Sequence, residues 1–128
     1  MDPVVHFEIP AKDVKRASAF YNKAFGWAFN QFPNFEYWSI GTTESDQQGN
    51  PTSPGAINGG LGKKGSTAPK DPTVTIRVAD IDAALKNISK LGGKVTGKKT
   101  PVGDMGFTAY FEDTEGNNIG LWQNTGGM

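Results

Sequence analysis

The chain has 128 residues, of which 36% are hydrophobic and 20% are charged, with 13 basic and 13 acidic side chains. This amounts to one domain with enough apolar material for a core, so the composition excludes a disordered protein. The zero formal net charge argues against a protein that coats nucleic acid or an anionic membrane. Cysteine is absent, which excludes disulfides, thiolate metal sites and cysteine nucleophiles. No window approaches a membrane span and no secretory signal is visible, so we expect a cytoplasmic protein.

The first predicted element is a strand over residues 4–9, which we expect Pro10 to end. Successive side chains point to opposite faces of this strand, and one of the two faces is entirely apolar, as in a strand with one packed face. His6 and Glu8 share the face that is not packed. His6 is the only histidine in the sequence.

A helix is predicted to follow, with Asp13 as its N-cap, because a carboxylate there accepts hydrogen bonds from the amides of the first turn. The helix runs to Phe25, and Gly26 supplies the stop. Its apolar residues recur at the spacing of a helix that lies on a sheet. This stripe consists of Val14, Ala17, Phe20, Tyr21 and Ala24.

Three strands complete the first half, over residues 27–31, 35–41 and 55–62. The polar segment 42–54 reads as a long hairpin loop. Glycine in the last of these strands indicates a bulge, or close approach by a ligand or another backbone. Residues 63–72 are the expected linker to the second half.

The second half repeats this order of elements. A strand over residues 73–79 runs into Asp80 as the first strand runs into Asp13, and a helix follows each aspartate. In this repeat His6 aligns with Thr73. A repeat of this kind indicates two copies of one supersecondary unit.

The remaining elements of the second half follow the same rules. The second helix carries the apolar stripe Ile81, Ala84, Leu85, Ile88 and Leu91, and Gly92 and Gly93 end it. Short strands are expected over residues 94–97, 106–112 and 118–123. In the strand over 73–79, the expected packed face is Val74, Ile76 and Val78, and the other face is Thr73, Thr75 and Arg77.

The sequence therefore predicts an α+β fold, βαβββ twice, in one domain over residues 1–128. The two units span residues 1–62 and 73–128, joined by the linker 63–72. One such unit leaves a sheet face uncovered on the side away from its helix. We expect two units to form a cupped mixed sheet with the helices outside. The side chains that point away from the helices should line the cup.

A family resemblance is carried by three segments, "HFEIPAKDVKRASAFYNKAFGW", "TIRVADIDAALKNISKLGGKV" and "FEDTEGNNIGLWQ". They resemble the vicinal oxygen chelate superfamily, the group of glyoxalases, bleomycin-resistance proteins and ring-cleaving dioxygenases. The resemblance covers nearly the whole chain apart from the 42–54 loop and the linker. It implies the predicted fold and a homodimer. Because the superfamily includes metalloenzymes and metal-free binding proteins, the fold alone implies no activity.

The resemblance also implies four metal-ligand positions, on the first and fourth strands of each unit. They fall on His6, Thr73, Asn58 (or Gly59, if the strand shifts by one) and Gly120. Only His6 is a competent ligand, whereas zinc and related ions need three or four nitrogen, sulfur or carboxylate donors. We therefore expect no cofactor and no catalytic metal. The alternative is a divalent metal held by His6, with Glu8 as a second ligand.

Three functions stay open at this point. The leading prediction is a metal-free protein that binds an unidentified small molecule. The alternatives are a divalent-metal-dependent lyase, isomerase or dioxygenase with His6 as a ligand, and a metal-free enzyme in which His6 and Glu8 transfer protons. The predicted pocket consists of His6, Glu8, Asn58, Thr73, Thr75, Arg77, Tyr110, Gly120 and Trp122.

Four of the pocket residues also have a structural interpretation. His6 could be a polar residue that a neighbour holds in a half-buried strand. Arg77 either clamps an anionic group or, as we favour, pairs with an internal acid such as Glu8. Tyr110 and Trp122 either form an aromatic wall beside a planar ligand or fill the space of a metal site.

Overall fold

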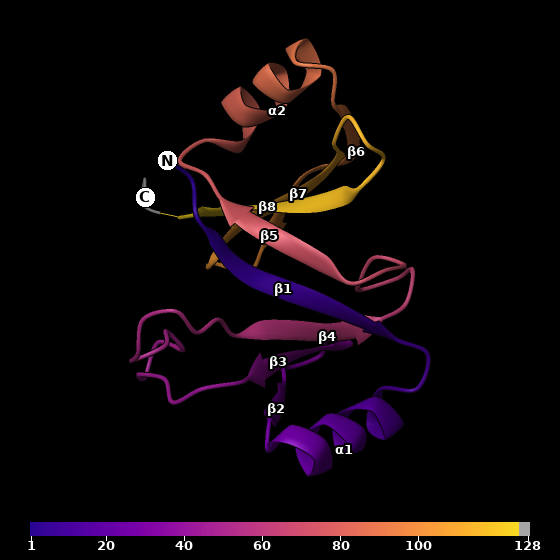
Figure 1. The fold of residues 1–128 in the computed structure, drawn as a ribbon, viewed down its shortest axis with the longest axis vertical. Coiled ribbons are helices and arrows are strands. Elements are labelled where there is room, and N and C mark those ends of the chain that lie inside the picture. The colour runs from indigo at the N-terminus through magenta and orange to yellow at the C-terminus, as the bar shows by residue number, and fades with distance from the viewer. Residues whose placement is uncertain (126–128) are drawn as a thin grey trace. The chain divides into compact units, whose positions relative to one another are not determined.

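The computed structural model describes residues 1–125 and contains eight strands and two helices within that range (Figure 1). The elements are β1 (Val4–Ala11), α1 (Val14–Phe25), β2 (Ala28–Gln31), β3 (Tyr37–Gly41), β4 (Gly59–Lys63), β5 (Thr73–Arg77), α2 (Ile81–Lys90), β6 (Lys94–Val102), β7 (Gly106–Glu112) and β8 (Asn118–Asn124). The predicted order, strand, helix and three strands in each half, is confirmed. The fold is α+β.

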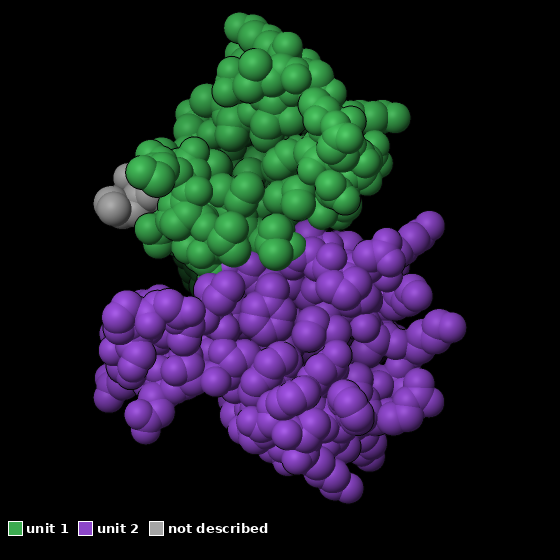
Figure 2. Space-filling view, in the orientation of Figure 1, with its two compact units in different colours: residues 1–5, 74–128 green, residues 6–73 purple. Residues whose placement is uncertain are grey.

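The chain divides into two compact units, coloured separately in Figure 2. Unit 2 is residues 6–73, and unit 1 combines residues 1–5 with 74–128, described as far as residue 125. The first residues of the chain therefore belong with the second repeat, where the amide of Arg77 donates to the carbonyl of Pro3 at 2.9 Å. The segment expected as a linker packs within unit 2, since Ala68 is only 4% exposed.

In unit 2 the strand order is β2-β3-β4-β1, with β1 parallel to β4 and the other neighbours antiparallel. The core consists of Ala11, Ile40 and Leu61, with Phe7, Ile9, Val14, Ala17, Trp27, Phe29 and Trp38 packed against it. Two of these residues come from α1, so this face of the sheet is the one that the helix covers. Side chains of the opposite parity lie on the other face.

In unit 1 the order is β5-β8-β7-β6, again with the first and last strands of the repeat parallel. Its core is Val78, Ile81, Ala109 and Leu121, packed against Ile76, Ala84, Leu85, Ile88, Phe107 and Phe111. The two units therefore share one sheet topology and one way of placing the helix on it. Each helix begins as predicted, because Asp13 accepts from the amide of Arg16 at 3.0 Å and Asp80 from the amide of Ala83 at 3.2 Å.

Several predicted boundaries were wrong. Pro10 does not end β1, because pairing with β4 continues from Pro10 opposite Gly62 to Ala11 opposite Lys63. β6 does not stop at Gly97, since irregularities in register on either side of Gly97 let the strand run on. β4 begins only at Gly59.

The apolar stripes were predicted too wide. Phe20, Val74 and Leu91 are 61%, 43% and 70% exposed, although each was expected on a packed face. Phe20 meets the edge of the neighbouring Tyr21 ring at 5.2 Å between centroids.

No helix in residues 1–125 is long and apolar enough to cross a membrane.

Candidate functional site

The face of unit 2 away from α1 is polar. Because Phe7 and Ile9 pack on the helix side, His6 and Glu8 lie on the opposite side of β1, as the alternation predicted. Glu8 is 7% exposed and His6 is half-buried. A buried carboxylate is costly unless hydrogen bonds or charges compensate it, so its surroundings define the candidate site.

Tyr37 of β3 connects these two side chains. Its hydroxyl donates to Glu8 Oε2 at 2.7 Å and lies 3.0 Å from His6 Nε2. The neighbouring residue Trp38 packs on the core side, so Tyr37 points to the polar face. The ring centroids of Phe32 and Phe35 lie 5.8 and 6.1 Å from the ring centroid of Tyr37. We call His6, Tyr37 and Glu8 the polar triad.

Gly60 makes room for the triad. It lies opposite Glu8 in the parallel pairing of β1 and β4. A Cβ atom built on Gly60 would overlap the Tyr37 hydroxyl and ring, so any larger residue would displace Tyr37. The need for glycine in this strand follows from close approach of a side chain, and not from an unusual backbone angle.

Burial lowers the pKa of His6 from its ordinary value of 6.5, and the Glu8 carboxylate opposes this shift without reversing it. His6 is therefore a neutral imidazole at neutral pH. An ionised carboxylate only accepts hydrogen bonds, so the single proton of Tyr37 is directed to Glu8. The contact between His6 and Tyr37 then requires His6 Nε2–H to donate to the tyrosine oxygen.

Asn58 lies outside this cluster, just before β4. Its Oδ1 accepts from the amide of Thr42 at 2.9 Å, and its Nδ2 donates to Ser45 Oγ at 2.7 Å and to the carbonyl of Gly49 at 3.2 Å. These contacts show that the Asn58 side chain holds the ends of the polar loop together. The residue equivalent to Gly120 in unit 2 is Gly60, since Thr75 lies opposite Gly120 as Glu8 lies opposite Gly60.

Unit 1 brings together three of the other predicted pocket residues. Tyr110 and Thr75 both lie opposite Gly120, on β7 and β5. A Cβ on Gly120 would lie 2.8 Å from Thr75 Oγ1 and 3.3 Å from Tyr110 Cε1. Thr75 is buried. This group contains hydroxyls but neither an acid nor a histidine.

The remaining predicted residues have other partners. Thr73 belongs to unit 2, is buried, and donates through Oγ1 to the carbonyl of Asp71 at 2.9 Å. Trp122 Nε1 donates to Asn124 Oδ1 at 2.6 Å. Arg77 is exposed and forms no ion pair within residues 1–125.

The donor set does not fit a catalytic metal. Residues 1–125 contain no group of three or more histidine, cysteine, aspartate or glutamate side chains placed to hold an ion. In the triad, Tyr37 bridges His6 and Glu8, and Gly60 and Gly120 offer no side-chain donor. A tetrahedral site requires more donors than these.

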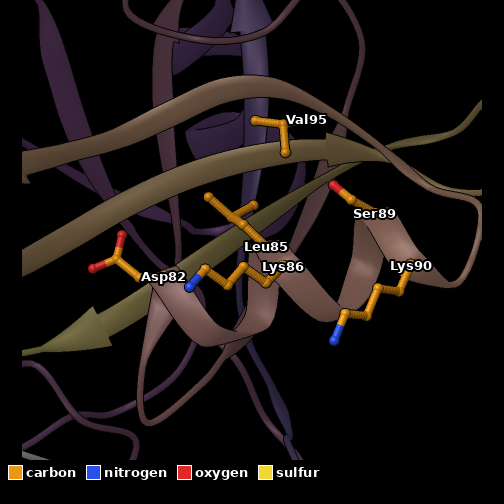
Figure 3. Close-up of a pocket in the computed structure, with 6 residues that line it drawn as sticks. All are labelled: Asp82, Leu85, Lys86, Ser89, Lys90 and Val95. Atoms are coloured by element: carbon orange, nitrogen blue, oxygen red, sulfur yellow. The ribbon is translucent and has the colours of Figure 1, made fainter.

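Two open surface depressions lie elsewhere. The larger, about 460 Å³, lies between α2 and β6, where Leu85 points toward Val95 and Lys86 and Lys90 stand on the helix (Figure 3). The other, about 400 Å³, lies beside α1 and includes Phe20 and Tyr21. Neither depression contains a predicted site residue.

Comparisons with known proteins place this geometry in context. Residues 4–42 match the family described as Bleomycin resistance protein-like N-terminal. A glyoxylase-like domain-containing protein from Didymella fabae is 35% identical over 114 residues, which cover 86% of this chain and 84% of that protein. The putative glyoxylase CFP32 of Mycobacterium bovis is 27% identical over 121 residues, which span 91% of this chain but 43% of that protein.

A solved structure shows the same fold. The glyoxalase/bleomycin resistance protein/dioxygenase superfamily member from Vibrio splendidus 12B01 superposes with a TM-score of 0.59 and 12% identity. The superposition covers 97% of this chain and 99% of that one. At this identity the likeness concerns the fold alone, which agrees with the α+β fold predicted from the sequence.

Proposed function

The chain belongs to the glyoxalase/bleomycin-resistance/dioxygenase superfamily, and we propose that it binds a small organic molecule at the polar triad of unit 2, without a catalytic metal. The observation that supports this proposal is the half-buried His6–Tyr37–Glu8 chain of hydrogen bonds, which ends on the buried Glu8 carboxylate. Burying the Glu8 carboxylate beside a half-buried imidazole lowers stability compared with apolar side chains of similar volume. Such an arrangement is typical of a site that recognises a ligand.

A screen against small molecules tests this proposal. Molecules that raise the melting temperature of the wild-type protein should lose this effect in His6→Ala. They should also shift NMR resonances of the triad. Tyr21→Phe serves as a matched control, because Tyr21 lies on α1 and stacks on Trp27 at 5.1 Å between centroids. Molecules that stabilise His6→Ala as strongly as the wild type would show that the triad is not the binding site.

The proposed absence of a metal has its own test. Purified protein is analysed for bound elements and then titrated with Zn²⁺, Ni²⁺ and Fe²⁺, with His6→Ala as the control. We expect substoichiometric metal and no difference between the two proteins. Stoichiometric metal that is lost in His6→Ala would instead support a metal-dependent lyase, isomerase or dioxygenase.

A metal-free enzyme is the second candidate, and one observation favours it. A neutral His6 that donates through Nε2 keeps the lone pair of Nδ1, which is the requirement for a general base. A ligand found in the screen would then exchange a carbon-bound hydrogen with solvent D₂O. This exchange should disappear in His6→Ala and slow in Tyr37→Phe. Binding without exchange identifies a binding protein.

We also propose a homodimer. Phe20 and Phe25 of α1 are 61% and 64% exposed, and each lies beside the ring of Tyr21, at 5.2 and 6.4 Å between centroids. A cluster of exposed aromatic side chains commonly marks an interface. Size-exclusion chromatography with light scattering should give twice the monomer mass, and Phe20→Ser should shift it toward the monomer. A monomer at micromolar concentration would contradict this proposal.

A further inference from the structure

We propose that the ligand of the polar triad presents a neutral or cationic hydrogen-bond donor, an O–H or N–H group, to His6 Nδ1, and that the site rejects anions. This inference rests on the proposed function and names its ligand class. It follows from the direction of the hydrogen bonds, from the access to Nδ1 and from the distribution of charge in unit 2.

The direction of the hydrogen bonds determines what His6 can offer. Tyr37 has one proton and gives it to Glu8 Oε2, 2.7 Å away. Its oxygen therefore accepts the proton of His6 Nε2, at 3.0 Å. A neutral imidazole that is protonated on Nε2 is an acceptor at Nδ1. The triad thus converts the negative charge of Glu8 into a fixed acceptor on His6.

Nδ1 is accessible to a ligand. The contact with Tyr37 uses Nε2, and Nδ1 forms no hydrogen bond with any residue in 1–125. The same residues contain no buried side-chain nitrogen or oxygen that lacks a partner. Nδ1 is therefore not sealed in the interior, and water or a ligand supplies its donor.

The charges of unit 2 favour a donor over an anion. The charged member of the triad is the Glu8 carboxylate, and His6 is neutral beside it. Every lysine and arginine of unit 2 is exposed, namely Lys12, Lys15, Arg16, Lys23, Lys63, Lys64 and Lys70. An anion at His6 would face a lone pair and a carboxylate without a buried cation from this unit, and both interactions are repulsive.

The first test reads the imidazole directly. The protein has one histidine, so the ¹⁵N spectrum of histidine-labelled protein contains one pair of side-chain nitrogens. We expect Nε2 to carry the proton and Nδ1 to resonate as an unprotonated nitrogen at neutral pH. A proton on Nδ1 would overturn the proposal, because it would mean that His6 accepts from Tyr37.

The second test uses three probes of one shape, benzyl alcohol, benzylammonium and benzoate, at millimolar concentration. The alcohol and the ammonium should shift the Nδ1 resonance, and benzoate should bind at least about 10-fold more weakly, the factor that corresponds to one lost hydrogen bond. In Glu8→Gln, which keeps the shape and removes the charge, this discrimination should shrink. Correct folding of the variant is checked by its amide spectrum.

The outcomes separate the two proposals. Preferential binding of benzoate at Nδ1 would overturn the donor assignment and leave the triad as the binding site. An Nδ1 resonance that responds to none of the three probes would also overturn it. Probes that shift only residues of the α2/β6 depression, equally in wild type and His6→Ala, would overturn the proposed function itself.

Discussion

Units 1 and 2 have the same scaffold and different chemistry. Both contain a first strand, an aspartate N-cap, a helix and three further strands, and both pair the first strand in parallel with the last. The equivalent positions Glu8 and Thr75 each lie opposite a glycine. What differs is the polar face, which carries an acid and a histidine in unit 2 and threonine hydroxyls in unit 1. The scaffold therefore accommodates either set of side chains.

The two glycines show how the polar faces of the units differ. In unit 2 the space above Gly60 is filled by the hydroxyl of Tyr37, which lies diagonally across the sheet. In unit 1 the space above Gly120 borders Thr75 and Tyr110 less closely. The missing side chain at Gly60 thus leaves room for the hydrogen-bonded Tyr37 hydroxyl in unit 2, and the missing side chain at Gly120 leaves room for Thr75 and Tyr110 in unit 1. Four predictions test this comparison.

The largest effect is expected for Gly60→Ala compared with Gly120→Ala. A methyl group at Gly60 overlaps Tyr37, so it adds strain and separates Tyr37 from Glu8. We expect a loss of about 3 kcal/mol in the free energy of unfolding for Gly60→Ala and about 1 kcal/mol for Gly120→Ala. Urea denaturation measures both. Equal losses would mean that the two faces are packed alike.

Tyr37→Phe isolates the hydroxyl from the ring. The substitution removes one hydrogen-bond donor from the buried Glu8 and the acceptor of His6 Nε2. We expect a loss of about 1–3 kcal/mol in unfolding free energy. Tyr21→Phe is the control and should change it by less than about 0.5 kcal/mol. An unchanged free energy of unfolding in Tyr37→Phe would show that the chain of hydrogen bonds adds nothing to stability.

The caps test what the units share. Asp13→Ala and Asp80→Ala each remove one hydrogen bond to a first-turn amide, at 3.0 and 3.2 Å. Each should cost about 1 kcal/mol, and the two losses should agree within about 0.5 kcal/mol. Thermal denaturation followed by circular dichroism suffices. A large difference between the two variants would show that the repeat is not equivalent at its best-matched position.

The smallest effect is a pH dependence confined to unit 2. The pKa of His6 is lowered below 6.5 in the folded protein, because burial disfavours the imidazolium. Above pH 6.5 His6 is neutral in both the folded and the unfolded protein. As the pH falls through 6.5, His6 of the unfolded protein binds a proton first, so the free energy of unfolding decreases until the pH has passed the pKa of the folded protein. Denaturation between pH 7.5 and 5 should show this slope in the wild type. The slope should diminish in His6→Gln, and an unchanged slope would assign it to other groups.

Part of the candidate site followed from the sequence. The alternation of β1 placed His6 and Glu8 on one face, since the side-chain period of a strand is a local property. Tyr37 and Gly60 were not assigned to the site from the sequence. Tyr37 lay in a predicted strand, in which it and Trp38 point to opposite faces. The contact of Tyr37 and Gly60 with Glu8 depends on register between strands that are far apart in the chain. Asn58 was assigned to the pocket for the same reason, because β4 begins at Gly59, four residues later than predicted, and Gly60 is the residue that lies opposite Glu8.

The sequence by itself determined the repeat, both helix caps and the polarity of the face that carries His6, because these depend on spacing over a few residues. Only the tertiary structure decided that Pro10 stays within β1, that Gly60 lies opposite Glu8, and that Tyr37 joins His6 to Glu8. The physical reason is the same in each case. Pairing between distant strands selects the register, and the register decides which side chains meet.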